Sequence, residues 1–156
     1  FGDAAARELG KRVAQLEELQ RLLLILQGEI RCVRLTLPAV CELLAKDAKA
    51  PFQQFFWKVS EDLGKRTGQT AGEIWSRNLK EIQKLLFLTK KEQQDLEEFG
   101  QLLGRMDMPM QLSAIQFYQK KITLSLAEAK AAANSRQKLY RYLGALGGAA
   151  LVLVIM

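Results

Sequence analysis

The fold is decided by the stretch LSAIQFYQKKITLSLAEAKAAANSRQKLYRYLGALGGAALVLVIM, residues 112–156. It contains no proline, and apolar or aromatic residues recur every three or four positions at Ile115, Tyr118, Ile122 and Leu126. This spacing predicts one long helix whose first half packs as part of a bundle. Its last fourteen residues carry no charge, so we expect the same helix to tie a soluble domain to a membrane.

Positive charge gathers on this helix just before the uncharged run. Residues 111–156 carry six basic side chains and one acidic side chain, which accounts for +5 of the net charge of +6. Lys130, Arg136, Lys138 and Arg141 form a basic cuff, which fits the positive-inside rule and attraction to anionic lipid.

The alternative is a basic helical nucleic-acid-binding module in which Lys130, Arg136 and Lys138 contact phosphates. Such a module more often carries its basic face, interleaved with aromatic residues, on the folded domain itself. We therefore favour the membrane and expect no nucleic acid as a partner.

The membrane segment is predicted at residues 140–156, after a cytosolic helical domain at residues 1–139. The fourteen uncharged residues alone reach about 21 Å as a helix, short of a hydrocarbon core about 30 Å thick. Residues 140–142 bring the segment to 17 residues, near the lower limit for a span. Five side chains are expected at the membrane interface: Arg136, Lys138, Tyr140, Arg141 and Tyr142. The alternative is a hydrophobic helix buried against a protein partner, which leaves the basic cuff without a role.

The rest of the chain predicts five shorter helices and no sheet. The chain has only three prolines, and no stretch alternates with a period of two. Two capping boxes, Thr70–Glu73 and Thr89–Glu92, each mark the start of a helix. The expected helices span residues 4–33, 38–47, 51–65, 71–86 and 90–105. We therefore predict an all-α fold, a single-domain antiparallel bundle of about six helices with a long last helix.

The first helix carries a long apolar stripe. Its members recur at spacings of three and four: Leu9, Val13, Leu16, Leu19, Leu23, Leu26, Ile30 and Val33. A stripe of this length fits the core of a bundle, and it also fits a coiled-coil seam between two protomers. We favour the bundle core.

Two sets of residues are candidates for contact. Phe99, Gly100, Leu103 and Gly104 form a predicted helix-packing strip, because two glycines in one helix cost about 1 kcal/mol each and close approach of another helix explains them. Trp57 and Asp107 are predicted partner-binding residues. Trp57 lies off the apolar face of its helix, and the commoner role of such a residue is a satellite of the core.

No residue pattern points to catalysis or to a metal. The chain has no histidine, and Cys32 and Cys41 are too few and too far apart for a zinc knuckle or a disulfide framework. We expect both to be reduced core thiols. The acidic residues, as in Glu17-Glu18 or Glu97-Glu98, lie among Lys and Arg and are expected on solvated faces. We expect no enzyme activity, no cofactor and no small-molecule substrate.

Short motifs along the whole chain resemble one family. The motifs are Arg12-Val-Ala-Gln15-Leu16, Gly28-Glu29-Ile30, Thr36-Leu37-Pro38 with Leu43, Phe55-Phe56 with Leu63, Ile74-Trp75 with Leu79, Phe99-Gly100-x-x-Leu103-Gly104-x-x-Asp107 with Gln111, Glu128-Ala129 and Leu143-Gly144. With these motifs the chain resembles the stage III sporulation protein AB family of endospore-forming bacteria. The motif from Phe99 to Asp107 is the most specific part of the match.

The resemblance implies a cytosolic helical domain between two hydrophobic helices. The chain opens on Phe1 with no initiator Met, so we expect a fragment from which the first of those helices was removed. The resemblance also implies a place in the mother-cell membrane around the forespore, with the soluble domain facing the cytoplasm. The family belongs to a transenvelope channel between the two cells that is required for endospore formation.

The middle of the chain is also similar to the F-type domain of the membrane platform protein of type II secretion and type IV pilus systems. The similar segments are residues 37–44, 63–64 and 70–75. That protein has two such domains and this chain has one, so the resemblance implies a homo-oligomer that supplies the second. The expected partners are a cytosolic secretion-type ATPase, other membrane proteins of the channel and the lipid bilayer. The expected function is a non-enzymatic membrane platform that docks the ATPase.

Overall fold

The computed structural model describes the backbone of residues 2–32, 36–105 and 108–155, and the side chains of residues 4–29, 36–105 and 111–135. Its elements are α1 (Gly2–Cys32), α2 (Leu37–Asp47), α3 (Phe52–Gly64), α4 (Ala71–Glu81), a 3-10 turn η1 (Gln83–Leu85), α5 (Lys90–Arg105) and α6 (Met108–Ile155). Six α-helices and no strand occur in these ranges, so the predicted all-α fold is confirmed.

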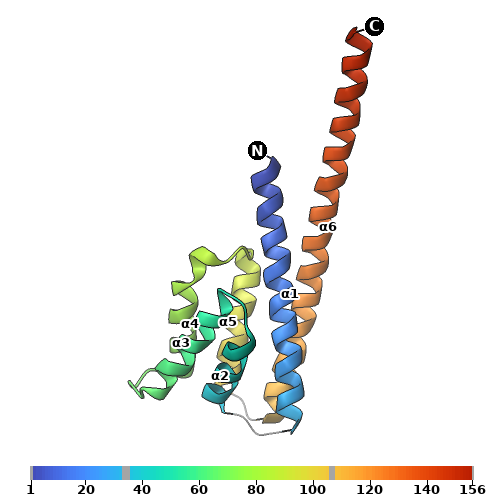
Figure 1. Cartoon of the computed structure of the whole chain (residues 1–156). Helices are drawn as coiled ribbons and strands as arrows, with labels where there is room; N and C mark the ends of the chain where they lie inside the picture. The colour runs from blue at the N-terminus through green and yellow to red at the C-terminus, as the bar shows by residue number, and fades with distance from the viewer. Residues whose placement is uncertain (1, 33–35, 106–107, 156) are drawn as a thin grey trace.

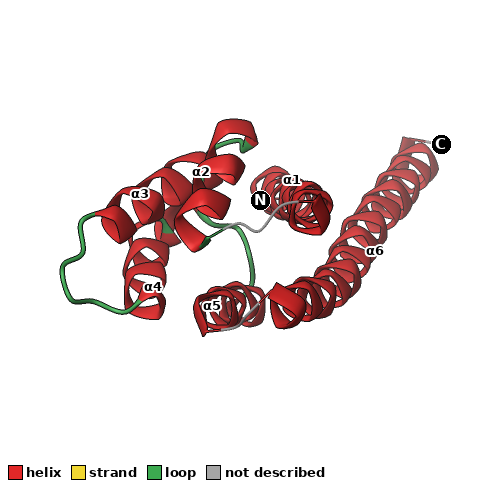
Figure 2. Cartoon of the chain, turned by 90° about the horizontal axis from the view of Figure 1, so that it is seen from below, coloured by secondary structure: helices red, strands yellow, loops and turns green. Residues whose placement is uncertain are grey.

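The long helices α1 and α6 lie side by side and antiparallel, and the shorter helices cover one flank of this pair (Figure 1). The first residues of α1 and the last residues of α6 point to the same end of the molecule, and the loop between α3 and α4 lies far from that end. The view from below shows α4 and α5 at the periphery, with α3 and α4 on the side away from α6 (Figure 2). Leu16, Leu19, Leu23 and Leu26 of the α1 stripe are buried in the core, and α1 packs against α6 of the same chain, so the structure favours a bundle core over a seam between protomers; Ile30 and Val33 lie outside the described side chains.

α6 continues as one helix from the bundle to Ile155. The described residues contain no helix with a stretch long and apolar enough to cross a bilayer. The predicted interface side chains Arg136, Lys138, Tyr140, Arg141 and Tyr142, and the uncharged run that follows, lie outside the described side chains. The membrane segment at residues 140–156 therefore stays a prediction.

The core is centred on Trp75, of which 1% is exposed. Its ring meets the rings of Phe55, Phe56 and Phe99 edge-on, with centroid distances of 4.9, 6.0 and 6.4 Å. Phe99 in turn stacks on Tyr118 at 4.6 Å. These contacts join α3, α4, α5 and α6 through a continuous row of aromatic rings.

The glycines of the predicted packing strip face α4. A methyl group added at Gly100 would come within 2.1 Å of the indole of Trp75, and one added at Gly104 would lie 3.1 Å from the methyl group of Ala71. Leu103, which lies between the two glycines in the sequence, is buried, and Phe99 belongs to the aromatic row. α5 thus approaches α4 closely because these positions have no side chain.

The segment after α4 departs from the prediction. The fourth helix was expected to reach residue 86, but it ends at Glu81 and continues as the turn η1. The side chain of Gln15 on α1 holds the chain after this turn, because its amide donates to the Leu85 carbonyl (2.9 Å) and accepts from the Phe87 amide (2.8 Å). A contact from a distant helix therefore fixes the connection between α4 and α5.

The prediction that Glu18 lies on a solvated face is wrong. Only 7% of the side chain is exposed. Its carboxylate accepts two hydrogen bonds from Arg21 (2.7 and 2.8 Å) and one from the backbone amide of Lys49 (2.7 Å). The hydrogen bond from Arg21, with help from the Lys49 amide, lowers the pKa of Glu18. A carboxylate beside an Arg three residues on is typical of a solvated face, and the distant amide that buries it leaves no mark in the local sequence.

Arg12, Gln15 and Glu18 form a row of polar side chains on α1 that bind the shorter helices and their connections. Gln15 and Glu18 hold the α4–α5 and α2–α3 connections, as described above. Arg12 binds the carboxylate of Glu92, at the start of α5, with two hydrogen bonds of 3.0 and 2.5 Å. α1 therefore fixes the position of the shorter helices beside the α1–α6 pair.

Candidate interaction surface

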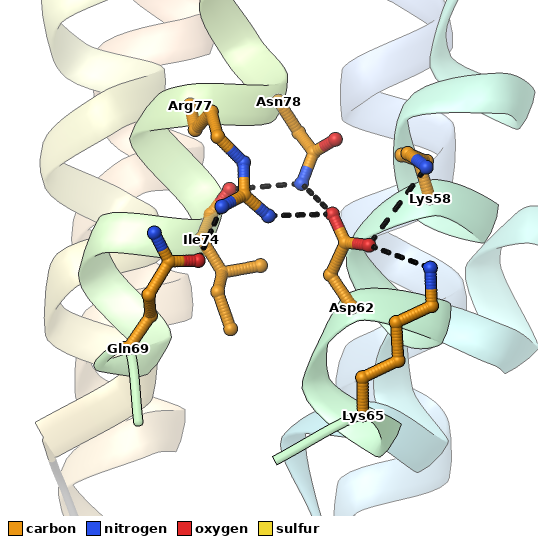
Figure 3. Close-up of polar contacts among 7 residues, drawn as sticks. All are labelled: Lys58, Asp62, Lys65, Gln69, Ile74, Arg77 and Asn78. Carbon is orange, nitrogen blue, oxygen red and sulfur yellow. Dashed lines mark hydrogen bonds and ion pairs between the residues drawn. The ribbon is translucent and has the colours of Figure 1, made fainter. Parts of the chain in front are cut away.

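The buried carboxylate of Asp62 organises the corner between α3 and α4 (Figure 3). Its Oδ2 accepts hydrogen bonds from Asn78 Nδ2 (3.0 Å) and Arg77 Nη2 (2.8 Å), both on α4. The ammonium groups of Lys58 and Lys65 lie 3.8 Å from Oδ1. One carboxylate is thus surrounded by three cations and an amide, and it joins the two helices.

The chain reverses direction next to this carboxylate. α3 ends at Gly64, and both Arg66 (φ +48°) and Gly68 (φ +83°) adopt the left-handed conformation that breaks a helix. Thr70 then caps α4 by accepting a hydrogen bond from the Glu73 amide at 3.1 Å, which agrees with the predicted helix start. Arg77 also donates to the side chain of Gln69, so the loop is fixed to α4.

The surroundings of Asp62 lower its pKa. The hydrogen bond from Asn78 is the main cause, burial acts in the opposite direction, and Arg77 and Lys58 lower the pKa further. A carboxyl group with a lowered pKa in the folded state adds stability above its ordinary value of 3.8, and this stability is lost as the pH falls through the lowered value.

Asp62→Asn is expected to lower the free energy of unfolding by about 1–2 kcal/mol at neutral pH, because the hydrogen bonds from Arg77 and Asn78 lose their charged acceptor. The exposed lysines add little to the loss, because solvent screens their attraction to Asp62. The loss should shrink as the pH falls below 3.8 and through the lowered pKa of Asp62, because the stability that the ionised carboxylate adds is lost over that range. Urea unfolding followed by circular dichroism between pH 3 and 7 measures both effects. Glu61→Gln, an exposed neighbour on α3, is the control, and an equal loss in that variant would contradict the prediction.

The two predicted partner-binding residues have different outcomes. Trp57 is 39% exposed on α3 and lies outside the buried core cluster, so both its partner-binding role and the alternative of a satellite of the core stay predictions. Its exposed ring remains a candidate contact for a partner. Asp107 lies outside the described residues.

Asp62, Arg77 and Asn78 were missed by the sequence analysis. A pattern was present, because Phe55, Val59 and Asp62 follow one another at helical spacing and all face the core. A carboxylate on an apolar stripe is rarely buried without a partner. Its partners on α4 were not readable, since they depend on how α3 and α4 pack.

The described residues hold no group of three side chains that could bind a metal ion. Cys41 is a free thiol in the core, as predicted, and burial raises its pKa to about 12. It therefore stays protonated at neutral pH and is a poor nucleophile. The side chain of Cys32 lies outside the described part of the chain.

The family model for "Stage III sporulation protein AB" matches residues 1–156. The chain is 29% identical over 155 residues to the stage III sporulation protein AB of Bacillus subtilis (strain 168), and the match covers 99% of this chain and 90% of that protein. A solved structure described as stage III sporulation protein AB superimposes with a TM-score of 0.70 at 28% identity, covering 80% of this chain and 97% of the other. These matches agree with the motifs found in the sequence.

Proposed function

This chain belongs to the stage III sporulation protein AB family, and from this premise we propose that it is a non-enzymatic membrane platform of the mother cell–forespore channel. In this role it docks a cytosolic secretion-type ATPase and meets other membrane proteins of the channel. The sporulation protein lies in the mother-cell membrane around the forespore, with its helical domain facing the cytoplasm. A homo-oligomer supplies more than one such domain.

The observation that carries the proposal is the continuity of α6. One helix packs in the core through Ile115, Tyr118 and Ile122 and runs on to Ile155 without a break. α6 belongs both to the helical domain and to the proposed membrane segment. A membrane that holds the C-terminal end of α6 therefore also sets the orientation of the helical domain. The α3–α4 corner then points away from the bilayer, where a cytosolic partner can reach it.

The polar residues of the domain support a scaffold rather than an enzyme. Its deeply buried carboxylates, Glu18, Asp62 and Glu92, are each bound by at least one arginine. Groups used in this way join helices and are not available as general acids or bases. The chain also contains no histidine.

Flotation with vesicles tests the membrane part of the proposal. The intact chain is expected to rise with vesicles of mixed neutral and anionic lipid, and a variant lacking residues 143–156 should stay at the bottom of the gradient. As a control for folding, circular dichroism of the intact and truncated chains should show the same helical signal per helical residue. An intact chain that stays at the bottom, or a truncated chain that floats equally well, would contradict the proposed membrane segment.

A further inference from the structure

α4 and α5 form a polar groove on the outside of the molecule. They run antiparallel, because Gln101 reaches Gly72 and Glu97 reaches Ser76. Two hollows of about 590 and 240 Å3 lie along this seam and share Ser76 and Lys80, so they form one continuous groove. The groove follows most of the length of both helices, and Figure 2 shows them at the edge of the bundle.

The floor of the groove is built from satisfied polar groups. Ser76 donates to Glu97 at 2.7 Å, and the amide of Gln101 donates to the Gly72 carbonyl and to the Ser76 hydroxyl, both at 2.9 Å. The close approach of the helices at Gly72 and Gly100 keeps this floor narrow. Such a surface offers hydrogen bonds and charge to a partner, rather than an apolar face.

α5 divides its charges between two sides. Three of its four acidic residues, Glu92, Asp95 and Glu98, bind cations of the long helices, namely Arg12 on α1 and Lys121 on α6, and the fourth, Glu97, faces the groove. These three acids are paired on the side away from the groove, with Glu92 buried and Glu98 still largely exposed. The cations at the two ends of α5 are left to line the groove.

The groove therefore carries an excess of positive charge. Its charged lining consists of Arg77, Lys80, Lys90, Arg105, Glu73 and Glu97. Arg77 is paired with Asp62, and Glu97 accepts the hydroxyl of Ser76. Lys80, Lys90 and Arg105 have no ion pair within the described residues and are exposed. Three solvated cations thus line a groove of hydrogen-bonding groups, and the carboxylates of Glu73 and Glu97 oppose them.

We propose that the α4–α5 groove is a docking site for an acidic helix of a partner protein, held by Lys80, Lys90 and Arg105. The inference rests on the proposed platform function, for which it supplies the contact surface. Two antiparallel helices make a cradle for a third helix, and the unpaired cations select glutamates and aspartates on that helix. The amides of the lining supply further hydrogen bonds. Charge pairs of this exposed kind set the association rate and the choice of partner more than the affinity, so the contact is reversible and sensitive to salt.

The test uses the intact chain in nanodiscs of neutral lipid. The probe is a fluorescent helical peptide of Glu and Ala, as long as α5, with its glutamates on one face; a peptide with Gln in place of Glu is the uncharged probe. The groove variant carries Lys80→Glu, Lys90→Glu and Arg105→Glu. The matched control carries Arg7→Glu, Lys46→Glu and Lys120→Glu, which are exposed on other helices and change the net charge equally. Binding is measured by fluorescence anisotropy at several salt concentrations.

Binding of the Glu peptide is expected to weaken about tenfold or more in the groove variant and to change little in the control. Equal weakening in both variants would show attraction to net charge alone and would overturn the inference. So would equal binding of the Gln peptide, or tighter groove-dependent binding of a single-stranded oligonucleotide of the same charge. Failure of this test leaves the platform proposal standing, because that proposal is tested with lipid and ATPase and does not depend on this groove.

Discussion

Trp75→Ala is expected to lower the free energy of unfolding by about 3–5 kcal/mol. The indole fills the centre of the core between Phe55, Phe56 and Phe99, and its Nε1 donates to the Leu96 carbonyl at 3.2 Å. The substitution leaves a cavity in the core and removes this additional hydrogen bond to the Leu96 carbonyl of α5. A loss of this size is comparable with the whole stability of a small domain, so the variant should be partly unfolded at room temperature. Urea unfolding followed by far-ultraviolet circular dichroism measures it.

The chain contains its own control for this substitution. Trp57 is the other tryptophan of the chain and lies exposed on α3. Trp57→Ala is expected to change the free energy of unfolding by less than about 1 kcal/mol, because this residue is 39% exposed and lies outside the core cluster. Similar losses in the two variants would contradict the placement of Trp75 at the centre of the fold.

Arg12→Ala is expected to lower the free energy of unfolding by about 3 kcal/mol at neutral pH. Arg12 pairs with Glu92, and their side chains are 14% and 4% exposed. The substitution therefore leaves the Glu92 carboxylate buried without its cation. Thr89 keeps its hydrogen bonds to Glu92 at the start of α5, which limits the loss. Arg7→Ala, an exposed arginine on the same helix, should change stability by no more than about 0.5 kcal/mol.

The effect of Arg12→Ala should depend on pH. Burial tends to raise the pKa of Glu92, but the hydrogen bonds from Arg12 and the Thr89 amide outweigh it and hold the pKa below its ordinary value of 4.5. In the wild type this carboxylate therefore adds stability above pH 4.5, and that stability is lost as the pH falls through the lowered pKa. Without Arg12, burial dominates and the neutral carboxyl is favoured. The difference between the two proteins should accordingly shrink toward pH 3, and a difference that stays constant from pH 7 to 3 would contradict this account of the pair.

The helices were largely readable because their signals are local. The caps at Thr70 and Thr89 gave the starts of α4 and α5, and the apolar spacing of Ile115, Tyr118, Ile122 and Leu126 gave the buried face of α6. Each of these features depends on residues no more than four positions apart, which is the range over which a helix determines its own structure.

The contacts that position the helices were not readable for the same reason. Glu18, Gln15 and Asp62 each bind a group on a distant element, and the local sequence does not identify that group. The α4–α5 groove depends on the angle between two helices and on which charges the rest of the fold neutralises, so it needs the three-dimensional arrangement.

Co-flotation of the ATPase tests the platform role most directly. Vesicles carrying the intact chain are mixed with the secretion-type ATPase of the same organism and centrifuged through a density gradient. The account predicts that the ATPase rises with the vesicles only when the chain is present, and that both proteins stay at the bottom when residues 143–156 are deleted. An ATPase that remains at the bottom while the intact chain floats would contradict the proposal that this domain is its docking platform.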